Sequence, residues 1–84
     1  MQPIKELLNK IKWDYRENPE AYSIFYFDRI LKKLIMIPYT KINRLEGSFM
    51  VLGNEEESNI PLHRIKKVKK GNIVIWERKV DEQN

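Results

Sequence analysis

The sequence contains no cysteine and only one histidine, His63, in 84 residues. The lack of cysteine excludes disulfide bonds, thiol nucleophiles and thiolate zinc sites. A single histidine also argues against a structural or catalytic zinc site. The sequence has no glycine-rich phosphate loop, no nucleophile motif and no paired-histidine metal motif. We therefore expect neither a metal ion nor a cofactor.

Long apolar runs are also missing. The longest, such as residues 34–37, are far shorter than the roughly 20 residues that a helix needs to cross a bilayer. No positively charged, then apolar, leader opens the chain. We expect a cytoplasmic protein with no membrane partner.

The charge is moderate, at a net +4, but it is unevenly distributed. Residues 29–44 hold five basic residues and no acid, and residues 60–79 hold seven basic residues and only Glu77. Segregated positive charge favours an anionic partner. The alternative is that the lysines only keep exposed strands soluble.

The apolar pattern predicts a single α+β domain over residues 1–84. Ile4, Leu7, Leu8 and Ile11 have the spacing of one helical face, which predicts a helix over about residues 3–12. Strands are expected at about 22–28, 32–37, 43–45, 48–52, 65–69 and 72–78. The helix would pack on a twisted antiparallel sheet of four to six short strands, which can curl into a partly open barrel. Trp13 and Tyr15 would form an apolar plug between helix and sheet.

Two segments match almost position for position. Residues 37–52 (IPYTKINRLEGSFMVL) and residues 60–76 (IPLHRIKKVKKGNIVIW) both begin with Ile-Pro and both reach a glycine before an apolar run. Each copy predicts a proline-started turn of helix or 3₁₀ helix, followed by a tight hairpin. His63 stands where the first copy has Thr40, so the backbone motif does not require a histidine.

The second copy carries the candidate site. His63 and Arg64 follow Pro61, and an imidazole beside a planar guanidinium suits the oxygens of a phosphate. A purely structural role for His63, with Arg64 solvated, is the alternative. Asp28 could orient His63 or Arg29, or it could form a plain ion pair at a strand end.

The final strand and the lysines before it are weaker candidates. Because successive side chains of a strand point to opposite faces, Trp76 and Arg78 are expected on one face together with Val74. Trp76 could stack on a base while Arg78 holds a phosphate, although tryptophan more often belongs to the core. Three lysines would add diffuse, salt-sensitive attraction for RNA: Lys66, Lys67 and Lys69.

The order of the motifs resembles a known family. LLNKIKWD (residues 7–14), YSIFYFDR (22–29), IPLHRI (60–65), the glycine at position 71 and IWER (75–78) are similar to the archaeal RNA cyclic-group-end recognition domains. The resemblance implies binding of RNA ends that carry a 2′,3′-cyclic phosphate. It also implies RNA-processing proteins as possible partners, because related eukaryotic domains are fused to RNA-processing modules. Its motifs fall on six residues of this chain: Asp28, Arg29, His63, Arg64, Trp76 and Arg78.

Three functions remain open at this point. The leading hypothesis is a small RNA-binding module in which His63, Arg64, Arg78 and Arg29 contact the terminal phosphate. The second is a protein-interaction domain that docks an acidic partner in RNA processing. The third is a weak cyclic phosphodiesterase. We expect binding without catalysis, because metal-free chemistry on a cyclic phosphate needs an acid and a base, usually two histidines.

Overall fold

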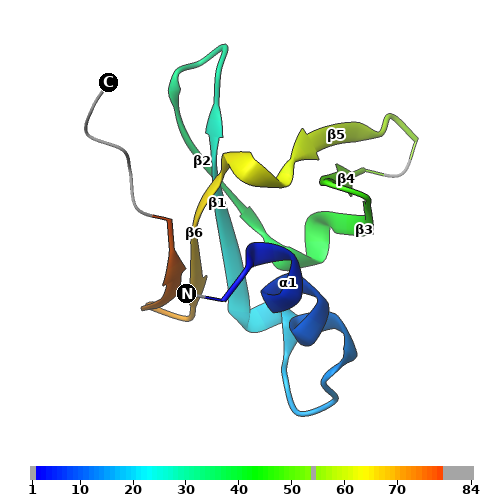
Figure 1. Cartoon of the computed structure of the whole chain (residues 1–84), viewed down its shortest axis with the longest axis vertical. Coiled ribbons are helices and arrows are strands. Elements are labelled where there is room, and N and C mark those ends of the chain that lie inside the picture. Colours follow the sequence, from blue (N-terminus) through cyan, green and yellow to red (C-terminus); the bar gives the residue numbers. More distant parts are fainter. Residues whose placement is uncertain (1, 54, 79–84) are drawn as a thin grey trace.

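The computed structural model describes residues 2–53 and 55–78 (Figure 1). These residues form one α-helix, three 3₁₀ turns and seven strands. In chain order the elements are α1 (Ile4–Trp13), η1 (Pro19–Ala21), β1 (Tyr22–Asp28), β2 (Lys33–Pro38), η2 (Tyr39–Lys41), β3 (Ile42–Glu46), β4 (Phe49–Leu52), β5 (Ser58–Pro61), η3 (Leu62–Arg64), β6 (Ile65–Lys70) and β7 (Ile73–Glu77). The predicted α+β class is confirmed.

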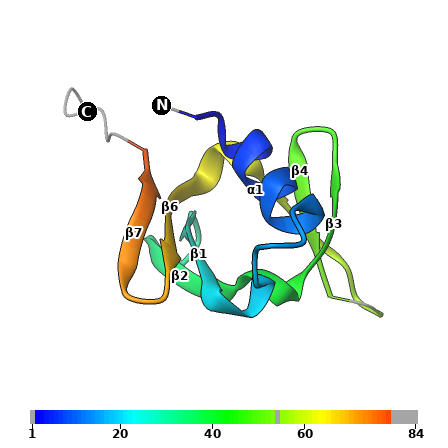
Figure 2. The same cartoon turned by 90° about the horizontal axis from the view of Figure 1, so that it is seen from below.

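The strands form two antiparallel sheets and do not close into a barrel. One sheet has the order β2-β1-β6-β7, and the other has the order β3-β4-β5. Figure 2 shows α1 lying between the two sheets. The division into two sheets and the strand β5 were not predicted, because β5 is only four residues long, partly polar and ends at a proline.

The two matching segments adopt the predicted conformation. Pro38 and Pro61 each precede a 3₁₀ turn, and a hairpin follows at Gly47 or Gly71. Both glycines have positive φ, of 58° and 61°, which favours glycine over other residues. The turn η2 carries the chain from the four-stranded sheet to the three-stranded sheet, and η3 carries it back.

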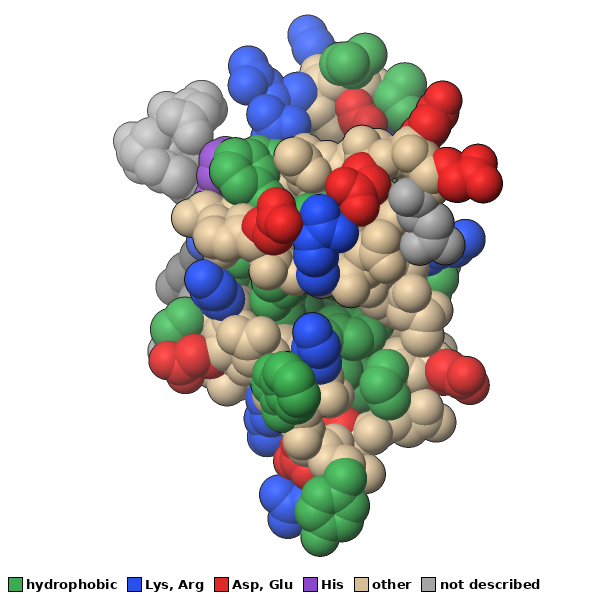
Figure 3. All heavy atoms as spheres, turned by 90° about the vertical axis from the view of Figure 1, so that its right-hand side faces the viewer, with side chains coloured by type: hydrophobic (Ala, Val, Ile, Leu, Met, Phe, Trp, Pro, Cys, Tyr) green, Lys and Arg blue, Asp and Glu red, His purple; other side chains and the backbone are tan. Residues whose placement is uncertain are grey.

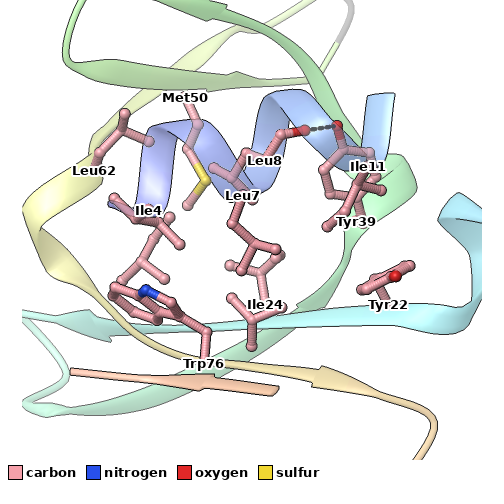
Figure 4. Packing of buried hydrophobic residues seen from close by; sticks show 12 residues of the cluster. Ile4, Leu7, Leu8, Ile11, Tyr22, Ile24, Tyr39, Met50, Leu62 and Trp76 are labelled. Atoms are coloured by element: carbon pink, nitrogen blue, oxygen red, sulfur yellow. Dashed lines mark hydrogen bonds between the residues drawn. The ribbon is translucent and has the colours of Figure 1, made fainter. Parts of the chain in front are cut away.

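The apolar face of α1 forms the centre of the core. Its four predicted residues are buried, and Leu8 is fully buried. Figure 4 shows these side chains packed between Ile24 and Trp76 of one sheet and Met50 of the other. The Tyr39 hydroxyl donates a hydrogen bond of 2.9 Å to the Leu8 carbonyl, which fixes η2 to the helix. Packing stabilises a helix that is too short to be stable alone.

Two sequence interpretations of apolar residues are wrong. Trp13 and Tyr15 do not plug the core, since their exposed fractions are 74% and 94%. Trp76 and Val74 do not share a sheet face, because the β6–β7 register shifts between them. Trp76 pairs with buried Val68 and is itself buried, whereas Val74 is exposed.

No helix among the described residues is long and apolar enough to cross a membrane.

Candidate nucleic-acid interface

A hollow of about 410 Å³ lies between the tip of the β1–β2 hairpin and strand β5. Three of the predicted site residues line it, together with polar and apolar groups from both sheets. The lining residues are Tyr26, Asp28, Arg29, Ile30, Leu52, Ser58, Asn59, Ile60 and Arg64. The hollow therefore brings together residues that are far apart in the sequence.

Arg64 reaches the hollow from η3, the turn at which the chain passes between the sheets. Leu62, the first residue of η3, is buried in the core. Its backbone N–H also donates a hydrogen bond of 2.8 Å to the Ser48 carbonyl, so side chain and backbone both fix the turn. The Nε atom of Arg64 is buried and has no hydrogen-bond partner among residues 2–53 and 55–78. A buried guanidinium donor without an acceptor costs free energy. The guanidinium group of Arg64 is therefore suited to bind an anionic ligand.

Arg29 enters the same hollow from the β1–β2 turn. Asp28 shapes this turn: its Oδ1 atom accepts hydrogen bonds from the backbone N–H groups of Ile30 and Leu31, each at 2.9 Å. Within the described part of the chain, Asp28 makes no hydrogen bond or ion pair with His63 or Arg29. Asp28 thus positions Arg29 through the backbone, rather than by direct contact.

The sequence did not point to the other polar lining groups. Tyr26 lies on the inner face of β1, and Ser58 and Asn59 belong to the unpredicted strand β5. Burial raises the pKa of the Tyr26 phenol, and the nearby Asp28 carboxylate raises it further. The phenol therefore stays protonated at neutral pH and can donate a hydrogen bond to a ligand.

His63 precedes Arg64 in η3 but does not line the hollow. Its side chain is exposed on η3, as is Thr40 at the equivalent position of η2. The second residue of this turn points to solvent in both copies. His63 is therefore accessible at the surface beside Arg64.

The guanidinium group of Arg78 makes its hydrogen bonds to the protein backbone. Its Nε donates to the Ile65 carbonyl at 3.0 Å, and a second guanidinium nitrogen donates to the Leu62 carbonyl at 3.4 Å. The guanidinium carbon also lies 5.1 Å from the centre of the Trp76 ring. Arg78 does not line the hollow. It fixes both ends of the segment that presents His63 and Arg64.

Trp76 belongs to the core. It is 6% exposed, and its indole N–H donates to the Gln2 carbonyl at 2.6 Å. The tryptophan ring is therefore not an open stacking platform.

The lysines of β6 lie in different surroundings. Lys67 and Lys69 place their ammonium groups 4.9 Å and 5.5 Å from the centre of the Phe25 ring, on the sheet face that points away from α1. Lys66 lies at the shift in the β1–β6 register. Lys70 forms an ion pair of 3.3 Å with Glu17. Only two of the four lysines thus share one surface.

A second hollow, of about 290 Å³, lies near Lys70 between α1 and the four-stranded sheet. Two of its three charged lining residues, Glu17 and Lys70, are paired with each other. Hydrogen bonds from Tyr22 and Lys70 hold the pKa of Glu17 below its usual value, and burial together with the Glu17 contact raises the pKa of Tyr22 to about 12. Among the described residues, Lys10 is the one charged lining group of this hollow without an ion pair, whereas two arginines line the first hollow.

The three-stranded sheet also offers little unpaired positive charge. Figure 3 shows acidic and basic side chains close together on this side of the molecule. Arg44 forms ion pairs of 2.9 Å with both Glu46 and Glu57. Among the described residues, no three His, Cys, Asp or Glu side chains are grouped to hold a metal ion. The hollow with Arg64 is therefore the candidate site.

The fold is that of a small α+β domain in which two arginines, Arg29 and Arg64, line one hollow. Residues 1–78 match the family described as the MJ1316 RNA cyclic group end recognition domain. The chain belongs to this family, which confirms the resemblance. No solved structure gives a significant match.

The relatives are archaeal UPF0248 proteins. One from Saccharolobus islandicus (strain L.S.2.15) is 35% identical over 78 residues, covering 89% of this chain and 98% of the relative. One from Metallosphaera sedula is 36% identical over 75 residues, covering 89% and 91%. One from Saccharolobus solfataricus is 32% identical over 78 residues, covering 89% and 95%.

The family description concerns recognition of RNA cyclic group ends. It supports a role in binding RNA ends. It describes a recognition domain and not an enzyme, in agreement with the prediction from the sequence.

Proposed function

We propose that the chain binds the phosphate of an RNA end, a 2′,3′-cyclic phosphate in particular, in the hollow between the β1–β2 tip and β5. Arg64 and Arg29 contact the phosphate oxygens. The observation that carries the proposal is that Arg64 lines this hollow together with Arg29, and that the Arg64 guanidinium group has a donor, Nε, without an acceptor among the described residues. A phosphate is a suitable acceptor for the two guanidinium groups.

The size of the hollow supports a small ligand. Its volume of about 410 Å³ lies within the range of about 300–1,000 Å³ that is typical of small-molecule sites. The lining also combines apolar groups, Ile60 and Leu52, with hydrogen-bonding groups, Tyr26 and Asn59. Such a lining can accommodate a terminal ribose beside its phosphate.

The charge of the hollow favours a cyclic phosphate over an open one. Arg29, Arg64 and Asp28 are its ionised lining residues, so the net charge is a single positive one. A cyclic phosphodiester carries one negative charge, whereas an open terminal phosphate carries about 1.5 to 2 at pH 7. The second charge of an open phosphate would be repelled by the Asp28 carboxylate.

His63 and Arg78 have different roles in this proposal. His63 is exposed beside Arg64, where it can donate to the phosphate or ribose of the bound end. Arg78 acts as a positioning residue, because its guanidinium group is hydrogen-bonded to the carbonyls of Leu62 and Ile65. The phosphate contacts then come from Arg64, Arg29 and His63.

A matched pair of variants tests the proposal. Lys41 of η2 occupies the position that Arg64 occupies in η3, and it is exposed and does not line the hollow. We expect Arg64→Gln to weaken binding of an oligonucleotide with a cyclic-phosphate end by about 10- to 100-fold, the effect of losing charge-assisted hydrogen bonds. Lys41→Gln removes the same charge and should change affinity by less than about threefold. Fluorescence anisotropy with labelled RNA measures both.

The same titration decides between ligands. Wild-type protein should bind a cyclic-phosphate end more tightly than the same RNA with an open phosphate or a hydroxyl. Equal affinity for all three ends would contradict end recognition. If the protein hydrolyses the cyclic phosphate and His63→Gln abolishes this hydrolysis, the phosphodiesterase hypothesis would be favoured instead. If Arg64→Gln still binds RNA but no longer binds an acidic protein partner, the protein-interaction hypothesis would be favoured.

A further inference from the structure

The four-stranded sheet has one face that α1 does not cover (Figure 2). On β1, Ile24 points into the core, so its neighbours Phe25 and Phe27 point outward. Their antiparallel partners on β2 point the same way, and Met36 lies opposite Phe25 while Leu34 lies opposite Phe27. We call this surface the open sheet face.

The open sheet face is apolar at its centre and partly exposed to solvent. Leu34 and Met36 are 45% and 56% exposed, and Val74 at the β7 edge is 43% exposed. Phe25 and Phe27 are half-buried, with part of each ring accessible to solvent. Contiguous exposed apolar side chains on a small domain indicate an interaction surface.

Two positive charges lie directly over this apolar centre. The Lys67 and Lys69 ammonium groups lie 4.9 Å and 5.5 Å from the centre of the Phe25 ring. Within residues 2–53 and 55–78 neither lysine has a carboxylate within ion-pair distance. The surface thus combines an aromatic ring with two ammonium groups that lack a carboxylate partner among the described residues.

We propose that the open sheet face binds single-stranded RNA, with a base stacked on Phe25 and the backbone phosphates held by Lys67 and Lys69. The inference rests on the proposed function for the class of ligand, and it extends that function to the strand that precedes the bound end. Aromatic rings for bases combined with lysines for phosphates are the usual elements of a single-strand binding surface.

The charges decide between RNA and an apolar protein partner. A protein that covered the Phe25 ring would bury both ammonium groups, which costs free energy unless it supplies anions at the same positions. A single strand brings phosphates and flat bases together. The phosphates draw the two ammonium groups off the ring, because a phosphate is a stronger partner for them than an exposed aromatic face. The ring is then available to a base.

The open sheet face leads to the hollow along β1. The β1–β6 pairing ends at Tyr26 and Ile65, so Phe27 and Asp28 extend beyond β6. Phe27 faces outward, whereas Asp28 lines the hollow. At about 3.3 Å per residue, Phe25 and Asp28 are separated by about 10 Å along the strand. A strand that leaves the hollow therefore has a short path to Phe25.

The test uses Phe25→Leu in the full chain, with Phe49→Leu as a matched control. Phe49 is a 43% exposed phenylalanine on β4 of the other sheet. Anisotropy titrations use one unstructured ten-nucleotide RNA with either a hydroxyl or a cyclic-phosphate end. We expect Phe25→Leu to weaken binding of both RNAs by about tenfold, with the affinity ratio between them unchanged. Phe49→Leu should bind both as wild type does.

A second variant tests the lysines independently of the ring. In Lys67→Gln/Lys69→Gln, the slope of the logarithm of the binding constant against the logarithm of salt concentration should fall by about 1.4, the value for two lost phosphate contacts on a single strand. Circular dichroism and urea unfolding verify that both variants are folded. Arg64→Gln should show the opposite pattern, with loss for the cyclic-phosphate RNA and little change for the hydroxyl RNA.

The outcomes separate this inference from the proposed function. Unchanged affinity of Phe25→Leu and an unchanged salt slope of the lysine variant would overturn it, even if Arg64→Gln loses end recognition. Tighter binding of an RNA duplex than of the single strand would overturn it as well. Loss of hydroxyl-RNA binding in Phe25→Leu would support it, even if Arg64 proved unimportant.

Discussion

Arg64 and Arg78 are both basic residues of the segment that carries the family motifs, but their guanidinium groups have different surroundings. Arg78 donates to two backbone carbonyls, whereas the buried Nε atom of Arg64 has no acceptor among the described residues. A satisfied guanidinium group stabilises the fold, and an unsatisfied one is available to a ligand. At the residue scale, the hydrogen bonds of each guanidinium group therefore distinguish Arg78, which stabilises the fold, from Arg64, which we propose binds the ligand.

This distinction predicts the effect of replacing Arg78. Arg78→Met keeps an apolar stem over Trp76 but removes the donors to Leu62 and Ile65. We expect the free energy of unfolding to fall by about 1–3 kcal/mol, the range for hydrogen bonds from a charged group. Arg29→Met is the control, since Arg29 is exposed, and it should change stability by less than about 0.5 kcal/mol. Urea unfolding measures both.

The opposite result would assign Arg78 a direct role. Unchanged stability together with a large loss of RNA affinity in Arg78→Met would mean that its guanidinium group contacts the phosphate. Reduced stability with a smaller loss of affinity fits the positioning role.

The sequence could identify the site residues only in part. Arg29 and Arg64 meet at one hollow, as the predicted His/Arg patch requires for those two residues. The sequence could not separate Arg78 from them, because its hydrogen bonds depend on how β7 lies beside η3. It could not place Trp76 either, since the shift in the β6–β7 register sets which face that residue occupies.

At the element scale, the molecule uses one local design twice. A proline, a 3₁₀ turn and a hairpin with a positive-φ glycine occur at η2–β3–β4 and again at η3–β6–β7. Short-range rules of turn chemistry fix such a unit, and for this reason the sequence predicted it. Strand β5 has no such local signal and forms by pairing with β4.

The three glycines predict a graded loss of stability on substitution by alanine. A Cβ at Gly47 or Gly71 would meet no atom within 4 Å, so only the positive φ opposes it. We expect each of these variants to lose about 1 kcal/mol of unfolding free energy. A Cβ at Gly53 would lie 2.7 Å from the Glu56 carbonyl oxygen, in addition to a φ of 84°. Gly53→Ala should therefore lose clearly more than either.

Thermal or urea unfolding of the three alanine variants measures this order. Since Leu52 lines the hollow next to Gly53, Gly53→Ala should also weaken RNA binding more than Gly47→Ala does. Equal destabilisation by all three substitutions would contradict the backbone account of the turn that follows β4.

At the scale of the whole molecule, α1 fills the space between two sheets and leaves two surfaces for a ligand (Figures 2 and 4). The hollow lies at the junction of the sheets, and the open sheet face lies on the outside of one of them. The helix and the fold class follow from apolar periodicity, which is local in the sequence. The junction depends on long-range pairing, and so the sequence alone could not locate the hollow.

The central claim is that the hollow between the β1–β2 tip and β5 is where an RNA end binds. The most direct measurement is an NMR titration of ¹⁵N-labelled full-length protein with a nucleoside 2′,3′-cyclic phosphate, which is too small to span the open sheet face. We predict saturable shifts of the backbone amides of Arg29, Asn59 and Arg64 and of the Arg64 Nε–H, with no comparable shift at Lys41. Saturable shifts confined to other surfaces, with the Arg64 Nε–H unmoved, would contradict the account.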